Sequence, residues 1–280
     1  MVSLIRTATE LAEKITDLRL MNADIGLVPT MGNLHEGHLS LVKASNKNHS
    51  ATIVTIYVNP TQFGEGEDLG AYPRTLEQDL EKLSGLGEGN IFVFCPEADK
   101  EIYPSVPMIN FSIPDLENTL CGLNRPGHFN GVMQVIYRLF NMVKPDTAYF
   151  GKKDFQQLRI IQSFAKEMFP EINVIGLDII REKSGLAMSS RNNYLTQSQK
   201  EEALHLRDTL NEAKTIFLKK SKDVYLFLDE EKKKNNLWDY LEILDSDKLS
   251  PPTTKTKKFL IAGAYKLGRA RIIDNITFDL

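Results

Sequence analysis

Residues 28–38 read Val-Pro-Thr-Met-Gly-Asn-Leu-His-Glu-Gly-His. The apolar run before it, residues 25–28, is typical of a buried strand, and residues 39–44 after it have the pattern of a helix. A strand, a glycine-bearing turn and a helix N-terminus favour anion binding, because unpaired backbone N–H groups and the positive end of the helix dipole point outward there. The stretch therefore predicts a nucleotide-phosphate site.

His35 and His38 add two rings to this turn, three residues apart and so on one face of a helical turn. They could be capping or surface histidines. A zinc site is a second interpretation, but the HExxH spacing is absent and no cysteine is nearby. Phosphate binding is favoured. About a quarter of free histidine is protonated at pH 7, and a bound phosphate anion raises the histidine pKa and so increases that fraction. Each ring could then donate to a phosphate oxygen.

The composition is that of an ordinary globular protein with a large core: 280 residues, 42% apolar and 25% charged. A net charge of −3 creates no field that attracts nucleic acid or an anionic membrane, so we expect neither as a partner. Cys95 and Cys121 have no CxxC spacing, which disfavours a structural zinc site or a disulfide framework. No run of about 18 apolar residues and no signal peptide are evident, so we expect a cytoplasmic protein.

Strands and helices alternate through the first part of the chain. Further strands are predicted at residues 52–58, 91–94, 148–150 and 174–180. Helices are predicted after two capping boxes, Thr7–Glu10 and Thr75–Gln78, and around residues 132–143 and 155–165. This order predicts an α/β fold with a doubly wound parallel sheet, Rossmann-like, over residues 1–180. Ligands bind beyond the C-terminal ends of such strands, where residues 28–38 and 59–64 both fall.

The composition changes after about residue 181. A capping box at Thr196–Gln199 begins a long helix, and short strands are predicted at residues 240–244, 258–264 and 271–276. The lysine-rich stretch Glu230–Asn236 is interpreted as a solvated loop or turn. We therefore expect a smaller α+β lid domain over residues 181–280.

Gly151-Lys152-Lys153-Asp154 repeats the opening pattern of strand, glycine, polar group and helix start. Lys153 could be a solvated surface charge or a phosphate contact. Asp154 could be a helix cap, a ribose partner or a magnesium ligand, and the cap is the simplest interpretation.

A second polar segment, Met188-Ser189-Ser190-Arg191, groups side chains that donate hydrogen bonds to phosphate, although it could be a plain loop. Gln62 and Gln157 carry neutral amides suited to hydroxyl or carboxylate groups, and either could instead face solvent.

The sequence resembles the pantothenate synthetase (pantoate–β-alanine ligase) family, within the nucleotidyl transferases that carry a similar histidine motif. The resemblance is dense to about residue 196, thins, and returns near the end. It rests on blocks that agree in order and spacing: Pro29–Gly32 with His35–His38, Val58–Phe63, Tyr72–Thr75, Arg125–Phe129, Lys153–Leu158, Met188–Asn192 and Arg271–Ile276. The histidine motif alone is shared by many enzymes; the blocks in series are specific.

The resemblance implies an enzyme that joins pantoate to β-alanine with ATP, through a pantoyl-adenylate, and releases AMP and pyrophosphate. It implies Mg²⁺ as a cofactor and a homodimer. A different adenylyl- or cytidylyl-transferase on the same fold is one alternative, and a non-catalytic nucleotide-binding regulator is another.

By matching position, the family's site residues carry over to this chain. ATP would contact Met31, Gly32, Asn33, Leu34, His35, Glu36, Gly37, His38, Gly151, Lys152, Lys153, Asp154, Ile180 (through its backbone), Met188, Ser189, Ser190 and Arg191. The catalytic members would be His38, a proton donor with His35 beside it, and two phosphate stabilisers, Lys153 and Arg191. Pantoate and β-alanine would be held by Gln62 and Gln157, with Asn59 and Arg125 as weaker matches, and Asp79 would help to place the metal.

Two positions depart from the family pattern. Cys121 and Lys152 each stand where the family more often has Glu. The lysine adds positive charge near the phosphates and should not abolish their binding.

Overall fold

The structure is a computed structural model that describes residues 2–87, 89–106, 109–234 and 236–280. It divides into two compact units. Unit 1 comprises residues 1–113, 124–152 and 157–178, and unit 2 comprises residues 114–123, 153–156 and 179–280. The predicted boundary between residues 180 and 181 stays a prediction, while the units add two short internal segments to the C-terminal part.

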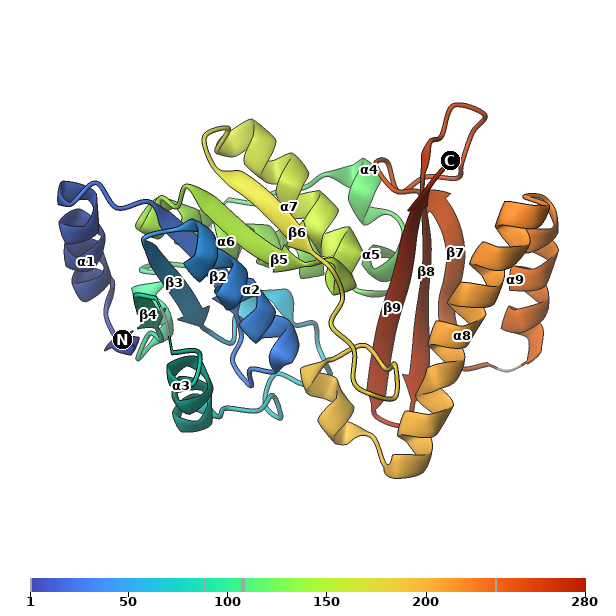
Figure 1. The fold of residues 1–280 in the computed structure, drawn as a ribbon, viewed down its shortest axis with the longest axis horizontal. Helices are drawn as coiled ribbons and strands as arrows, with labels where there is room; N and C mark the ends of the chain where they lie inside the picture. The colour runs from blue at the N-terminus through green and yellow to red at the C-terminus, as the bar shows by residue number, and fades with distance from the viewer. Residues whose placement is uncertain (1, 88, 107–108, 235) are drawn as a thin grey trace. The chain divides into compact units, whose positions relative to one another are not determined.

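Unit 1 is built on a parallel sheet (Figure 1). Among the described residues, six strands form it in the order β1-β4-β3-β2-β5-β6. Their bounds are β1 Val2–Ile5, β2 Ile25–Thr30, β3 Ala51–Ile56, β4 Ile91–Phe94, β5 Thr147–Gly151 and β6 Asn173–Leu177. The predicted α/β class with a doubly wound sheet is confirmed. The strands are near-continuous apolar runs because a parallel sheet is covered on both faces.

Helices and short 3₁₀ turns (η) connect these strands. They are α1 Ala8–Leu20, α2 Glu36–Asn48, η1 Pro60–Gln62, α3 Leu76–Ser84, η2 Asp99–Glu101, α6 His128–Val143, η3 Lys152–Asp154 and α7 Phe155–Met168. Helix α2 packs against β2, β3 and β5. The η3 turn and α7 are shared between the units, because residues 153–156 belong to unit 2.

The order of the strands places the predicted site. The chain runs outward from β2 through β3 to β4, then returns to the other side of β2 with β5 and β6. The direction of winding therefore reverses between β2 and β5, and ligands of open α/β sheets bind at such a reversal, beyond the carboxyl ends of the strands. Residues 31–35 follow β2 and residue 152 follows β5 at this edge.

Unit 2 holds an antiparallel sheet of β7 Trp238–Asp245, β8 Lys258–Leu267 and β9 Ala270–Asp279, in that order. Its helices are α4 Pro114–Glu117, α5 Leu120–Asn124, α8 Gln197–Lys219 and α9 Asp223–Lys234, with η4 at Ser190–Tyr194. Helix α8 packs against β8, β9 and α9 (Figure 1). Leu206 and Leu210 of α8 and Ile261 of β8 are buried in this core. No helix in the described part of the chain is long and apolar enough to span a membrane.

Most of the lysine-rich stretch is helix, and of its described residues only Asn236 lies in the predicted turn. Residues 230–234 form the last turns of α9, and Asn235 lies outside the described residues. Val224, Leu228 and Glu231 are buried at helical spacing, and Lys234 pairs with the Glu231 carboxylate. The helix therefore extends through these charged residues, because the face that carries Val224, Leu228 and Glu231 stays buried.

Smaller differences concern element ends. The Thr7 and Thr196 capping boxes are confirmed, but the Thr75 hydroxyl makes no capping bond and donates instead to Asp79, 3.2 Å away. Strand β1 is not predicted by the sequence pattern, and β6 ends three residues before the predicted Ile180.

Candidate functional site

The turn after β2 is held from inside the protein. Gly32 has φ +82°, and a Cβ there would lie 3.0 Å from Ile56, so the position suits glycine. The backbone N–H groups of Asn33 and Leu34 donate to the two carboxylate oxygens of Asp79, at 2.9 and 2.7 Å. The Gly32 N–H donates to the Thr30 hydroxyl at 3.1 Å. Asp79 is fully buried. These N–H groups do not point outward, which corrects the simple picture of an anion-binding turn.

His35 and His38 also bond to the backbone of this turn. His35 is the N-cap of α2, and its Nδ1 accepts from the Gly37 N–H at 3.1 Å, while the His38 Nδ1 accepts from the His35 N–H at 3.4 Å. The capping interpretation of His35 is therefore correct. A ring nitrogen that accepts carries no proton, so a neutral ring here has its hydrogen on Nε2. The two rings lie 4.1 Å apart and are half-buried. As neutral donors they can still serve a phosphate oxygen.

Gln62 is the last residue of η1, the turn that follows β3, and it lies beside Met31. Its Nε2 is 3.1 Å from the Met31 sulfur, and its Oε1 accepts from Asn59 Nδ2 at 3.1 Å. Asn59 is buried and also donates to the Gly131 carbonyl, while its Oδ1 accepts from the hydroxyls of Thr61 and Tyr103. The predicted substrate residues Gln62 and Asn59 are thus brought together, with Asn59 orienting the glutamine amide.

Arg125 forms a two-pronged ion pair with Glu67, with N–O distances of 2.7 and 2.6 Å. This hydrogen-bonded guanidinium lowers the pKa of the Glu67 carboxyl. The Arg125 Nη1 lies 2.9 Å from His128 Nε2, and His128 Nδ1 donates to the Gln62 carbonyl at 2.8 Å. A chain of contacts therefore links Arg125 to the backbone of the predicted pantoate residue.

After β5, Gly151 pairs with Leu177 in the sheet, and the Lys152 ammonium lies 2.6 Å from the Asp178 carboxylate. Both partners of that ion pair are exposed, so it is worth little stability. Gln157 is half-buried in the first turn of α7.

In unit 2, residues 180–188 fold back on themselves. The Met188 N–H donates to the Ile180 carbonyl at 3.0 Å, Arg181 bridges Ala187, and Gly185 makes the turn at φ +94°. The Ser189 hydroxyl then accepts from the Arg191 N–H at 3.3 Å as the N-cap of η4. The segment predicted to close over phosphate is a hairpin followed by a capped turn.

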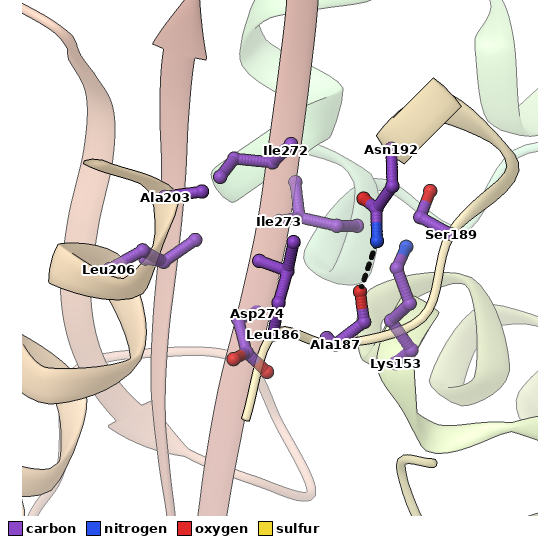
Figure 2. A pocket seen from close by; sticks show the side chains of 10 residues that line it. All are labelled: Lys153, Leu186, Ala187, Ser189, Asn192, Ala203, Leu206, Ile272, Ile273 and Asp274. Atoms are coloured by element: carbon purple, nitrogen blue, oxygen red, sulfur yellow. Dashed lines mark hydrogen bonds between the residues drawn. The ribbon is translucent and has the colours of Figure 1, made fainter. Parts of the chain in front are cut away.

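Beside this segment lies a pocket (Figure 2). Its lining residues are Lys153, Leu186, Ala187, Ser189, Asn192, Ala203, Leu206, Ile272, Ile273 and Asp274. In Figure 2 the Lys153 side chain points toward Ser189 and Asn192. The Asn192 amide donates to the Ala187 carbonyl at 3.0 Å and to Glu182 at 2.8 Å, which holds one wall in place. The Lys153 ammonium also lies 3.5 Å from the exposed Asp154 carboxylate.

The predicted residues therefore gather in two groups. Unit 1 brings together the histidines with their turn, and Met31 with Gln62 and Asn59. Unit 2 brings Lys153 to Ser189, whereas Ser190 and Arg191 are not among the described residues that line this pocket. The polar lining residues that the sequence did not predict are Asn192 and Asp274. Both stand inside blocks that matched the family, which was the available signal.

The two groups differ in the chemistry that their side chains offer. The unit 2 pocket offers an ammonium and a serine hydroxyl, donors that fit phosphate oxygens. The unit 1 residues offer neutral amides and imidazoles, which fit a hydroxy acid and a developing charge. No group of three His, Cys, Asp or Glu side chains suited to a metal occurs among the described residues.

Comparison with known proteins agrees with this chemistry. The family model described as Pantoate-beta-alanine ligase matches residues 3–277. The pantothenate synthetase of Sulfurihydrogenibium sp. is 43% identical, over 93% of this chain and 94% of its own length, and that of Thermosipho africanus is 42% identical, over 94% and 98%.

Solved structures agree as well. The Thermus thermophilus pantothenate synthetase has a TM-score of 0.88 at 33% identity, covering 99% of each chain. A Francisella tularensis pantoate-beta-alanine ligase, complexed with beta-gamma ATP and beta-alanine, has a TM-score of 0.77 at 30% identity, covering 99% of this chain and 97% of its own. The chain belongs to the pantoate-beta-alanine ligase family.

Proposed function

We propose that this protein joins pantoate to β-alanine with ATP, through a pantoyl-adenylate, and releases AMP and pyrophosphate. It is a ligase that forms a C–N bond. The observation that carries the proposal is the family match across residues 3–277. The Francisella relative, complexed with beta-gamma ATP and beta-alanine, supports ATP and β-alanine as substrates.

The first step must bring two anions together, a carboxylate and a triphosphate. Correct positioning of reactants is worth about 7–11 kcal/mol, and one preorganised donor at a developing charge about 3–4 kcal/mol. General acid–base catalysis contributes less, roughly 10²–10⁴-fold in rate. We therefore assign His35, His38 and Lys153 chiefly to stabilising phosphate charge, with proton donation by His38 secondary.

The remaining contacts follow the predicted set. Arg191, with Ser189 and Ser190, binds the triphosphate, and residues 184–192 close over the adenylate to exclude water. Gln62 and Gln157 hold pantoate, and Gln62 lies near the β-alanine. After adenylation, the free amine of β-alanine attacks the activated carbonyl carbon, the amide C–N bond forms and AMP leaves.

Asn59 and Arg125 have assignments beyond direct substrate contact. Asn59 Nδ2 donates to Gln62 and Gly131 while its Oδ1 accepts two hydroxyls, which fills the four hydrogen-bonding positions of an amide. Arg125 is engaged by Glu67. Both support Gln62, Asn59 by contacting its side-chain amide and Arg125 through His128.

Mg²⁺ belongs to the proposal as the ion that accompanies ATP. Magnesium in such sites keeps several waters and binds through phosphates with one or two carboxylates. Asp79 is the predicted protein contact, yet its two oxygens already accept two backbone N–H groups and the Thr75 hydroxyl. The carboxylate fits a metal only by giving up part of this set, so no catalytic step is assigned to it. A homodimer, which the resemblance implies, and a cytoplasmic location, which the sequence pattern predicts, complete the proposal.

One assay tests the function. Purified protein is incubated with ATP and Mg²⁺, omitting pantoate and β-alanine in turn, while AMP and pyrophosphate are measured. We expect AMP release only when pantoate and β-alanine are both present. When β-alanine alone is omitted, we expect pantoyl-adenylate to remain bound to the enzyme. Pyrophosphate release that needs neither acid would indicate a different nucleotidyl transferase. ATP binding without turnover under every condition would indicate a regulator.

A further inference from the structure

The block Arg271–Ile276 resembles the family, but none of the proposed substrate-binding or catalytic residues lies in it. In unit 2 it lies on β9, an outer strand of the antiparallel sheet. Three of its polar side chains, Arg271, Asp274 and Asn275, each contact a different segment of the same unit. Those segments include both pieces of chain assigned to phosphate in unit 2.

Asn275 holds the segment that carries Lys153. Its Nδ2 donates to the Lys153 backbone carbonyl at 2.9 Å, and the asparagine is only 6% exposed. A buried hydrogen bond of this kind fixes the carbonyl, because breaking it would leave a polar group unsatisfied. The Lys153 side chain is 18% exposed and lines the pocket with Ser189.

The other end of the segment is held by Gln156. Its Oε1 accepts from the Cys121 N–H at 2.9 Å, and its Nε2 donates to the carbonyls of Leu116 and Thr119, both at 2.8 Å. The Arg271 guanidinium in turn contacts the Cys121 sulfur at 3.4 Å. Residues 153–156 are thus held at both ends within unit 2, where β9 contacts Lys153 directly and is linked to Gln156 through Cys121.

Asp274 holds the hairpin of residues 180–188. Its carboxylate accepts from both terminal nitrogens of Arg181, at 2.6 and 3.0 Å, and Arg181 also donates to the Gly185 carbonyl. Two neighbouring residues of one strand therefore fix the Lys153 segment and the hairpin that leads to Ser189. A single strand sets the spacing between the two phosphate-binding pieces.

We propose that Asn275 is a positioning residue for Lys153: it holds the lysine backbone so that the ammonium points into the pocket beside Ser189. The inference rests on the proposed function, which gives Lys153 its phosphate. A displacement of about 1 Å in a catalytic group can cost a hundredfold in rate, so one backbone contact is enough to matter.

The test is a double-mutant cycle. Asn275→Asp keeps the shape and removes the donor, and Lys153→Ala removes the group that Asn275 is inferred to position. The two single variants, the double variant and the unchanged protein are compared in pantoate-dependent pyrophosphate release. Asn275→Ala is a second variant that places no carboxylate against the carbonyl. Asn211→Asp is the matched control, because Asn211 also donates to a backbone carbonyl in unit 2, at 3.1 Å, but is exposed.

We expect Asn275→Asp to lower kcat by about tenfold or more, with an unchanged KM for pantoate, and to have less than about a twofold effect once Lys153 is alanine. An equal loss of kcat with Lys153 and with Lys153→Ala would overturn the inference, because Asn275 would then act through general stability of the fold and not through Lys153. Wild-type rates for both Asn275 variants, or failure of both to fold, would overturn it too. If Lys153→Ala alone keeps the wild-type rate, the assignment of Lys153 fails instead.

Discussion

The carboxylate of Asp79 lies 2.7 Å from the backbone nitrogen of Leu34, although the two residues are 45 positions apart. A fully buried acid thus takes up the N–H groups that the sequence pattern would leave for a phosphate. Asp79 therefore holds the turn without a ligand. The histidine rings, rather than the N–H groups of Asn33 and Leu34, remain available to contact one.

Asp79→Asn should therefore destabilise the protein by about 1–3 kcal/mol, because an amide opposes one N–H group with its own NH₂ and leaves that donor unsatisfied. The KM for ATP should rise with the loosened turn. Denaturant unfolding and ATP kinetics measure both, with the exposed Glu77→Gln on the same helix as the control. A changed Mg²⁺ requirement at unchanged stability would instead favour the metal-ligand role.

His38→Ala should reduce adenylation by at least about a hundredfold, the usual cost of losing one preorganised donor at a developing charge. Pantoate-dependent pyrophosphate release measures it. His205→Ala is the control, because His205 is 41% exposed on α8 and pairs with Glu231. Near wild-type adenylation in the His38 variant would remove that residue from the mechanism.

Gln157→Ala should raise the KM for pantoate, with little change in the KM for ATP, because we propose that the lost amide contacts only the acid. Initial rates at varied pantoate and ATP separate the two constants. Gln162→Ala is the control. Gln162 lies further along α7, where it contacts Arg159, and its loss should leave both KM values unchanged. An ATP-specific defect in the Gln157 variant would contradict its assignment.

Much of this site could be predicted from the sequence, and the reasons are local. Strands β2 and β3 are predicted because their sequences are rich in apolar and β-branched residues. The start of α2 is predicted because His35 immediately precedes a helical pattern. The partners of these elements could not be predicted, because Asp79 reaches the turn only through folding. The prediction of a loop or turn over Glu230–Asn236 was wrong for residues 230–234 for the same reason, because burial of Leu228 and Glu231, a tertiary effect, extends the helix through these charged residues.

Asp24 should make stability fall in acid. The Ser50 hydroxyl and N–H donate to its carboxylate and, together with His49, lower its pKa from 3.8 to about 2. A folded-state pKa below the unfolded one stabilises the protein above about pH 3.8, and this contribution is lost as the pH falls toward 2.

Thermal unfolding between pH 5 and pH 2 measures this loss. Asp24→Asn should lower Tm at pH 5 and flatten the decline below it. Asp17→Asn, on the exposed face of α1, should keep the slope of the unchanged protein. Parallel slopes for the Asp24 variant and the unchanged protein would show that another group is responsible.

The contacts of β9 also bear on how the protein is made. The ribosome synthesises residues 270–279 after every segment that this strand holds. A nascent chain that stops short of β9 already carries all six parallel strands and Lys153, but lacks the asparagine and the aspartate that fix the lysine and the hairpin. If Lys153 has the role proposed for it, competence to activate a carboxylic acid arrives only once β9 has been made, because a chain shortened before this strand would lack the Asn275 contact to the Lys153 carbonyl.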